Sequence, residues 1–139
     1  MAIPYLACMA LVAHVYTLPP RVLPSIHAIE GGQVGTVHPN QDGSEDLGVM
    51  QVNTRWIIPL ARYTGLGADV VRARLLREPC FNIAAAGAIL RTYLDEERGD
   101  LMQAIGDYHS RTPTLNQAYQ LEVKGAAFEL FVRPKAAPR

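Results

Sequence analysis

Residues 83–90 constrain the fold most, because five of these eight residues are alanine or glycine. They lie in the middle of the longest predicted helix, which begins at Glu78-Pro79 and runs to about Glu97. Small side chains over almost two turns let neighbouring helices approach closely. Gly87 costs roughly 1 kcal/mol in a helix interior relative to alanine, so we expect a close contact there. The segment predicts the central, Ala-rich helix of a bundle.

The rest of the chain predicts a mainly α, single-domain protein with a small β element. Further helices are expected at residues 6–16, 20–30, 68–76, 101–108 and 114–131, and residues 48–63 are apolar but interrupted by Pro59. Residues 33–47 are polar and rich in turn formers, and Asp42-Gly43 favours a short β-hairpin or a structured loop there. The predicted domain covers residues 1–132, with 133–139 as a disordered tail.

The charge and residue patterns exclude several classes of function. Lysines plus arginines equal aspartates plus glutamates, 13 each, so there is no basic surface for nucleic acid. No apolar run approaches the roughly 18 residues that would span a membrane. The histidines and cysteines lack metal-ligand spacing, and no phosphate-binding glycine loop follows a strand. We therefore expect no metal, no cofactor, no nucleic acid and no membrane span.

Glu30 is the leading candidate for chemistry. It ends an apolar-patterned segment, and Gly31-Gly32 follows it at once, so the carboxyl lies where a helix should stop. A helix-end glutamate is commonly exposed or in an ion pair. Burial against apolar side chains would instead raise its pKa and make it a general acid.

Polar residues after Glu30 complete a candidate site. Asp46 either caps the segment that follows it or provides a second carboxylate, the pair that cleaves glycosidic bonds. Gln51 and Asn53 either satisfy buried backbone or bind the hydroxyl and N-acetyl groups of a sugar. Tyr108 either packs in the core or orients the acid. Cys8 and Cys80 are either a disulfide or two buried thiols, and the count alone favours neither.

Taken together, these motifs resemble the soluble lytic transglycosylase family of the lysozyme superfamily, especially its small members associated with secretion, conjugation and pilus systems. The resemblance covers residues 8–119. The family's catalytic glutamate matches Ile29-Glu30-Gly31-Gly32, and its Gly-Leu-Met-Gln-Ile-Asn signature matches Gly48-Val49-Met50-Gln51-Val52-Asn53. Its Pro-Cys-x-Asn-Ile and Tyr-Asn or Tyr-His elements match Pro79-Cys80-Phe81-Asn82-Ile83 and Tyr108-His109-Ser110.

The resemblance implies a lysozyme-like fold, a Cys8–Cys80 disulfide and a periplasmic or secreted protein that acts on peptidoglycan glycan strands. Residues 3–15 are then a first helix, and we expect a native signal peptide to be absent from this chain. The resemblance also implies a monomer that works with components of a secretion or conjugation machine.

Three functions follow from the resemblance as expectations. In a lytic transglycosylase, Glu30 acts alone as acid and base and forms 1,6-anhydromuramoyl ends, while Ser44, Asp46, Gln51, Asn53 and Tyr108 shape the cleft or position the substrate. In a lysozyme-type muramidase, Asp46 is the second carboxylate and water completes hydrolysis. A non-catalytic glycan-binding assembly subunit is the third, although such a protein should have lost Glu30, Gln51 or Tyr108.

Overall fold

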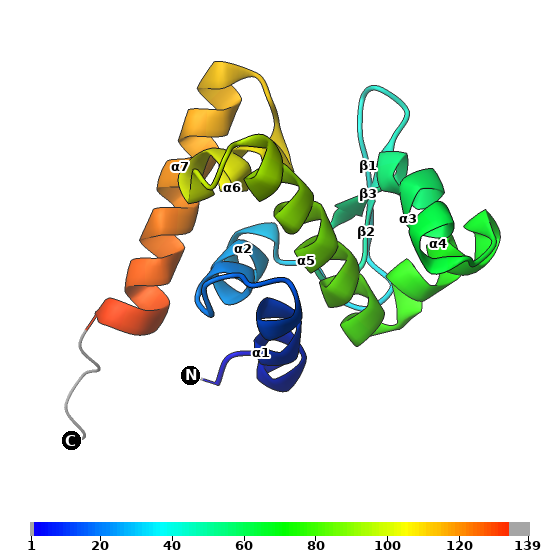
Figure 1. Ribbon diagram of the computed structural model, residues 1–139, viewed down its shortest axis with the longest axis horizontal. Coiled ribbons are helices and arrows are strands. Elements are labelled where there is room, and N and C mark those ends of the chain that lie inside the picture. Colours follow the sequence, from blue (N-terminus) through cyan, green and yellow to red (C-terminus); the bar gives the residue numbers. More distant parts are fainter. Residues whose placement is uncertain (1, 134–139) are drawn as a thin grey trace.

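The computed structural model describes residues 2–133, and these form a mainly helical domain with a small antiparallel sheet (Figure 1). The helices are α1 (Leu6–Val15), α2 (Val22–Glu30), α3 (Ile57–Thr64), α4 (Ala68–Arg77), α5 (Pro79–Glu96), α6 (Leu101–His109) and α7 (Pro113–Ala127). The short helical turn η1 (Thr54–Trp56) precedes α3, and the wide π-helical turn η2 (Phe128–Val132) continues α7. The expected fold class is confirmed at this level. The predicted tail at 133–139 lies outside the described residues except for Arg133.

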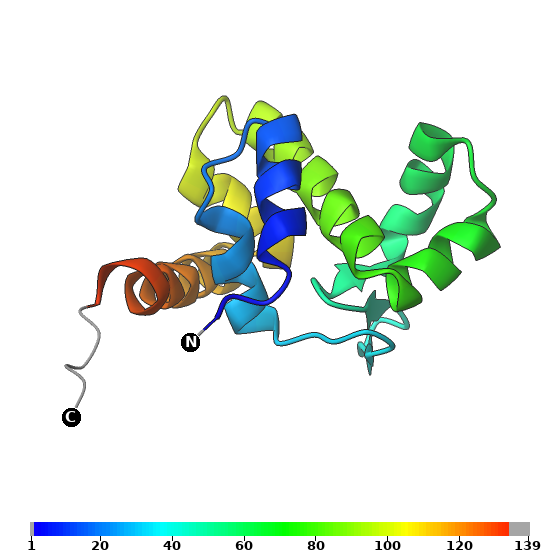
Figure 2. The same ribbon diagram turned by 90° about the horizontal axis from the view of Figure 1, so that it is seen from below.

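Helix α5 lies in the middle of the domain, with α1, α2, α6 and α7 on one side and the sheet, α3 and α4 on the other (Figures 1 and 2). It begins at Pro79, where proline fits the first turn of a helix. A Cβ at Gly87 would collide with the side chain of Val12 and crowd the ring of Tyr16. The close approach of α1 to α5 is therefore the reason that a glycine is suited to this position.

The sheet is a three-stranded meander of β1 (Val37–Pro39), β2 (Glu45–Leu47) and β3 (Val52–Asn53). Strands β1 and β2 form the hairpin expected from Asp42-Gly43, and Gly43 has the positive φ of 86° that the turn requires. Strand β3 was not predicted. It pairs Asn53 with Asp46, so Asp46 is a strand residue and does not cap a helix.

A buried asparagine joins the sheet to α5. Asn82 is fully buried, and its Nδ2 donates to the carbonyl oxygens of Leu47 and Leu75 at 2.8 and 2.9 Å. Its Oδ1 accepts from the Met50 backbone N–H at 2.7 Å. One side chain thus satisfies three buried backbone groups of the turns around Gly48 and the end of α4.

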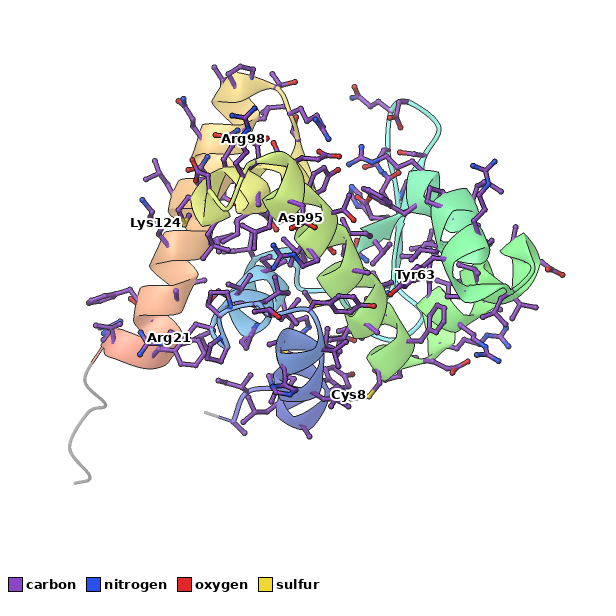
Figure 3. The ribbon with its side chains drawn as sticks, viewed as in Figure 1. Cys8, Arg21, Tyr63, Asp95, Arg98 and Lys124 are labelled. Atoms are coloured by element: carbon purple, nitrogen blue, oxygen red, sulfur yellow. A yellow bond between two sulfur atoms is a disulfide. The ribbon has the colours of Figure 1, made fainter. Side chains whose placement is uncertain are left out.

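A disulfide between Cys8 and Cys80 links α1 to the first turn of α5, across 72 positions of the sequence (Figure 3). This confirms the pairing that the family resemblance implied. None of the helices described within residues 2–133 is long and apolar enough to cross a membrane.

Two local expectations fail for backbone reasons. Pro59 does not interrupt the segment, because it is the third residue of α3, where its missing N–H has no partner in the helix. The helix expected at residues 20–30 begins at Val22, after Arg21 and without a side-chain cap, and Thr17 before it has a positive φ of 52°.

Candidate active site

A cavity of about 820 Å³ opens between the end of α2, the sheet, α5 and the connection from α6 to α7. All six residues that the sequence singles out for the site line it, namely Glu30, Ser44, Asp46, Gln51, Asn53 and Tyr108. The other lining residues are Asn40, Gln41, Asp42, Val52, Arg55, Trp56, Ile89, Tyr93, His109, Ser110 and Arg111. The fold therefore collects polar groups from distant parts of the chain around one hollow.

Glu30 is the last residue of α2, and Gly31 ends the helix with a φ of 65°. The next residue, Gly32, is buried, and a Cβ there would collide with the backbone carbonyl oxygens of Gly48 and Val49. The backbone that follows Glu30 is therefore packed directly against the turn that follows β2. This contact explains why the glutamate is followed by two glycines, which meet two different requirements.

The environment of Glu30 favours a protonated carboxyl. Burial is the main cause that raises its pKa from 4.5 to about 7, while the hydrogen bond from Tyr119 works in the opposite direction. The negative charges of Asp46 and Glu122 add to the increase. At neutral pH the group therefore exists in both forms, which suits an acid that must also act as a base.

Tyr119 of α7 holds the carboxyl of Glu30. Its hydroxyl donates to Glu30 Oε2 at 2.6 Å, and the negative charge and burial raise the pKa of Tyr119 well above 10, with burial the larger cause. The ring of His109 stacks on the Tyr119 ring, with centroids 4.9 Å apart and planes 12° apart. Sequence reasoning missed this role, because Tyr119 occupies an ordinary core position of its helix and lies 89 residues from Glu30.

Asp46 faces the cavity within a network of amides and hydroxyls. Asn53 Nδ2 donates to Asp46 Oδ1 and to Ser44 Oγ, both at 3.0 Å. Ser44 Oγ in turn donates to Asp42 Oδ1 at 2.6 Å, and Asn40 Nδ2 donates to Ser44 Oγ at 3.1 Å. The network fixes the carboxylate of Asp46 on the wall of the cavity that the sheet provides.

The two remaining predicted residues are anchored to backbone. Gln51 has a positive φ of 54°, and its Nε2 donates to the Gly48 carbonyl at 2.9 Å. Tyr108 donates its hydroxyl to the Met50 carbonyl at 2.7 Å, and not to Glu30. Both therefore brace the turn between β2 and β3, while Tyr119 provides the contact to Glu30 that was expected of Tyr108.

An aromatic wall completes the cavity above α5. Trp56 packs edge-on against Tyr93, with ring centroids 5.7 Å apart. The Arg111 guanidinium lies over the Tyr93 ring, 5.2 Å from its centroid. Aromatic side chains beside polar groups are common where ligands bind. The sequence held one signal for this wall, because Trp56 is the only tryptophan and closely follows Asn53.

Within residues 2–133, no cluster of three or more histidine, cysteine or acidic side chains is placed to hold a metal ion. The chemistry available at the cavity is that of one carboxyl with a raised pKa, the two further carboxylates of Asp42 and Asp46, and several amides. No protein-family model matches the chain, and a search of curated proteins gives no match.

Proposed function

We propose that the protein is a peptidoglycan lytic transglycosylase with a lysozyme-like fold. The observation that carries the proposal is the carboxyl of Glu30, whose pKa is raised to about 7 inside a cavity of about 820 Å³. A cavity of this size accepts several sugar rings. The amides of Asn53 and Gln51 and the rings of Trp56 and Tyr93 offer polar and apolar contacts to a glycan.

The proposed reaction uses Glu30 twice. Its carboxyl first donates a proton to the oxygen that links N-acetylmuramic acid to N-acetylglucosamine, as the bond from that oxygen to C1 breaks. The acetamido group of the muramic residue stabilises the positive charge at C1. The ionised Glu30 then removes the proton of the 6-hydroxyl, whose oxygen bonds to C1. This closes the 1,6-anhydro ring and returns Glu30 to its protonated form.

Hydrolysis by a lysozyme-type mechanism is the second candidate, and one observation favours it. Asp46 lines the same cavity, and its negative charge is one of the smaller causes that raise the pKa of Glu30. In that case Asp46 would stabilise or attack C1, and water would complete the reaction. The products distinguish the two candidates, because hydrolysis leaves reducing ends.

We propose the periplasm or the cell exterior as the site of action, where the Cys8–Cys80 disulfide would persist. There the enzyme would open the cell wall for a secretion, conjugation or pilus apparatus. A glycan-binding assembly subunit without catalytic activity is the alternative of another class. The intact set of Glu30, Gln51 and Tyr108 around one cavity favours an enzyme over such a subunit.

The test is digestion of purified peptidoglycan followed by mass spectrometry of the released muropeptides. We expect anhydromuramoyl ends from the wild type and no release from Glu30→Gln. Glu78→Gln is the matched control, because Glu78 is exposed at the start of α5 and lies outside the cavity. Full activity of Glu30→Gln would refute the proposal, and binding without release by the wild type would favour the assembly subunit.

A further inference from the structure

The ring of His109 lies between the cavity and Tyr119, the residue that holds Glu30. His109 is the last residue of α6, it is exposed and it lines the cavity. Tyr119 is 3% exposed and is not among the residues that line the cavity, and its ring stacks on the His109 ring with centroids 4.9 Å apart. One exposed ring therefore separates the buried tyrosine from the water in the cavity.

The backbone around His109 is fixed by the contact of α6 with α7. Asn116 of α7 is 1% exposed, and its Nδ2 donates to the Ser110 carbonyl oxygen at 2.9 Å and to Asp107 Oδ1 at 3.0 Å. The Asn116 side chain also lies so close to Gly106 that a Cβ there would collide with it. These contacts lie on both sides of His109 in the sequence, so its ring extends from a backbone that is held in place.

The cover over Tyr119 matters because its hydroxyl holds the carboxyl of Glu30 with a bond of 2.6 Å. Burial is the largest cause that raises the pKa of Glu30, and the bond from Tyr119 comes next and lowers it. Water admitted at Tyr119 would hydrate the carboxylate and donate hydrogen bonds to it, and both effects favour the ionised form. Loss of the cover should therefore lower the pKa of Glu30, whereas loss of the tyrosine bond alone should raise it.

The other ionisable groups that act on Glu30 remain when His109 is replaced. Asp46 of β2 and Glu122 of α7 raise the pKa of Glu30 through their negative charges. Tyr108 of α6 stays neutral, because burial is the main cause that raises its pKa well above 10. The His109 ring is itself ionisable, so the test needs a variant that keeps a ring without its nitrogens.

We propose that His109 is a positioning residue that acts on Glu30 through Tyr119. Its ring covers the phenol ring, keeps water from the hydrogen bond between Tyr119 and Glu30, and holds the phenol in the orientation that this bond requires. Because His109 serves the same proton donor, its role in catalysis rests on the proposed function. His109 itself neither gives a proton to the substrate nor takes one from it.

The test is an NMR titration between pH 4 and 9 of the side-chain carboxyl carbons in a chain labelled with ¹³C-glutamate. The Glu30 signal is identified by its loss in Glu30→Gln, and we expect a midpoint of about 7 in the wild type. His109→Ala should lower the midpoint by roughly 1 pH unit, because water stabilises the charged form of a carboxyl. His109→Phe should keep the wild-type midpoint, since it retains a ring that stacks on Tyr119.

His14→Ala is the matched control, because His14 is exposed on α1 and is not among the residues that line the cavity. Thermal melting followed by circular dichroism verifies that each variant is folded. An unchanged midpoint in His109→Ala would overturn the positioning role. An equal fall in His109→Phe would also overturn it, because the effect would then belong to the imidazole nitrogens and not to the cover.

Digestion of peptidoglycan separates this role from the proposed function. His109→Ala should lower kcat several-fold with little change in KM, because the proton donor is less well oriented, and His109→Phe should restore most of the rate. An inactive wild type would refute the proposed function, while the titration would still decide whether His109 sets the pKa of Glu30. An active wild type with an unchanged midpoint in His109→Ala would refute the positioning role alone.

Discussion

The hydroxyl of Tyr119 donates a 2.6 Å hydrogen bond to Oε2 of Glu30 and so joins α7 to the end of α2. The bond favours the ionised carboxylate and opposes the burial that favours the neutral acid. The pKa of Glu30 near 7 is therefore a balance of opposing effects. Removal of either effect should shift the pH dependence of the reaction in a direction that can be stated in advance.

Tyr119→Phe should move the alkaline limb of the pH–activity profile to higher pH. The variant loses the bond that lowers the pKa of Glu30 and keeps the burial that raises it. Activity at the optimum should also fall roughly tenfold, because the carboxyl loses its orienting contact, a loss of about 1.4 kcal/mol. Initial rates of peptidoglycan solubilisation between pH 4 and 9 provide the measurement. Tyr63→Phe is the control, because Tyr63 is exposed and does not line the cavity, and an unmoved or lowered limb would contradict the prediction.

Glu30→Gln should stabilise the fold at alkaline pH. The pKa of Glu30 is about 7 in the folded protein against 4.5 ordinarily, so unfolding releases a proton between these values and the stability falls as the pH rises. The loss of folding stability caused by ionising the buried Glu30 is absent below pH 4.5 and complete above pH 7, where it is on the order of 3 kcal/mol. Glutamine is neutral and can still accept the bond from Tyr119. Its melting temperature should exceed that of the wild type by several degrees at pH 8 and match it at pH 4.

Asp46→Asn should preserve the reaction if Glu30 works alone. Asparagine can still accept the bond from Asn53, so the sheet wall should remain in place. We expect less than about a tenfold loss of activity, anhydro products, and an alkaline limb at lower pH because the charge that raises the pKa of Glu30 is gone. A loss of several orders of magnitude would instead assign Asp46 a direct role at C1 and favour hydrolysis.

Asn82→Ala should be among the most destabilising single changes. It leaves the Met50 N–H and two carbonyl oxygens buried without partners, each at a cost of about 1–3 kcal/mol. We expect a loss of about 4 kcal/mol in the free energy of unfolding, measured by urea denaturation. Thr92→Ala removes one exposed hydroxyl from the same helix and should cost less than about 1 kcal/mol. Similar effects of the two variants would show that the three bonds of Asn82 contribute little.

Removal of the disulfide should destabilise the domain without moving the site. In the chain-entropy model, closure of a loop of 72 residues is worth roughly 4 kcal/mol. Cys8→Ser combined with Cys80→Ser should therefore lower the melting temperature to the value that the wild type has in the presence of reductant. At low temperature, where the variant is still folded, it should release the same products from peptidoglycan as the wild type. A double variant as stable as the oxidised wild type would argue against this contribution.

Local signals predicted the parts of the fold that depend on local chemistry. The helix expected at residues 101–108 is confirmed as α6, and Asp100 caps it by accepting from the Gln103 N–H at 3.1 Å. The small residues around Gly87 predicted the close approach of another helix. In each case the residue type is required by the backbone at that position, so the sequence carries the information directly.

The partners of individual site residues could not be predicted in the same way. Tyr108 and Tyr119 are both tyrosines at inward positions of helices, and only the three-dimensional arrangement decides which hydroxyl reaches Glu30. Strand β3 is two residues long and forms because Asn53 pairs with Asp46, a contact between segments that no local pattern specifies. Long-range pairing thus determines the finer geometry of the cavity.

The contact of Gly32 with the backbone of Gly48 and Val49 has a consequence for which sequence changes the region beside Glu30 can tolerate. Main-chain atoms hold the segment after Glu30 against the turn that follows β2, so this contact does not depend on which side chains line the cavity. Substitutions at lining positions such as Gln41 or Arg111 therefore leave the contact in place. A residue larger than glycine at position 32 would instead force the two backbone segments apart, whatever side chains line the cavity.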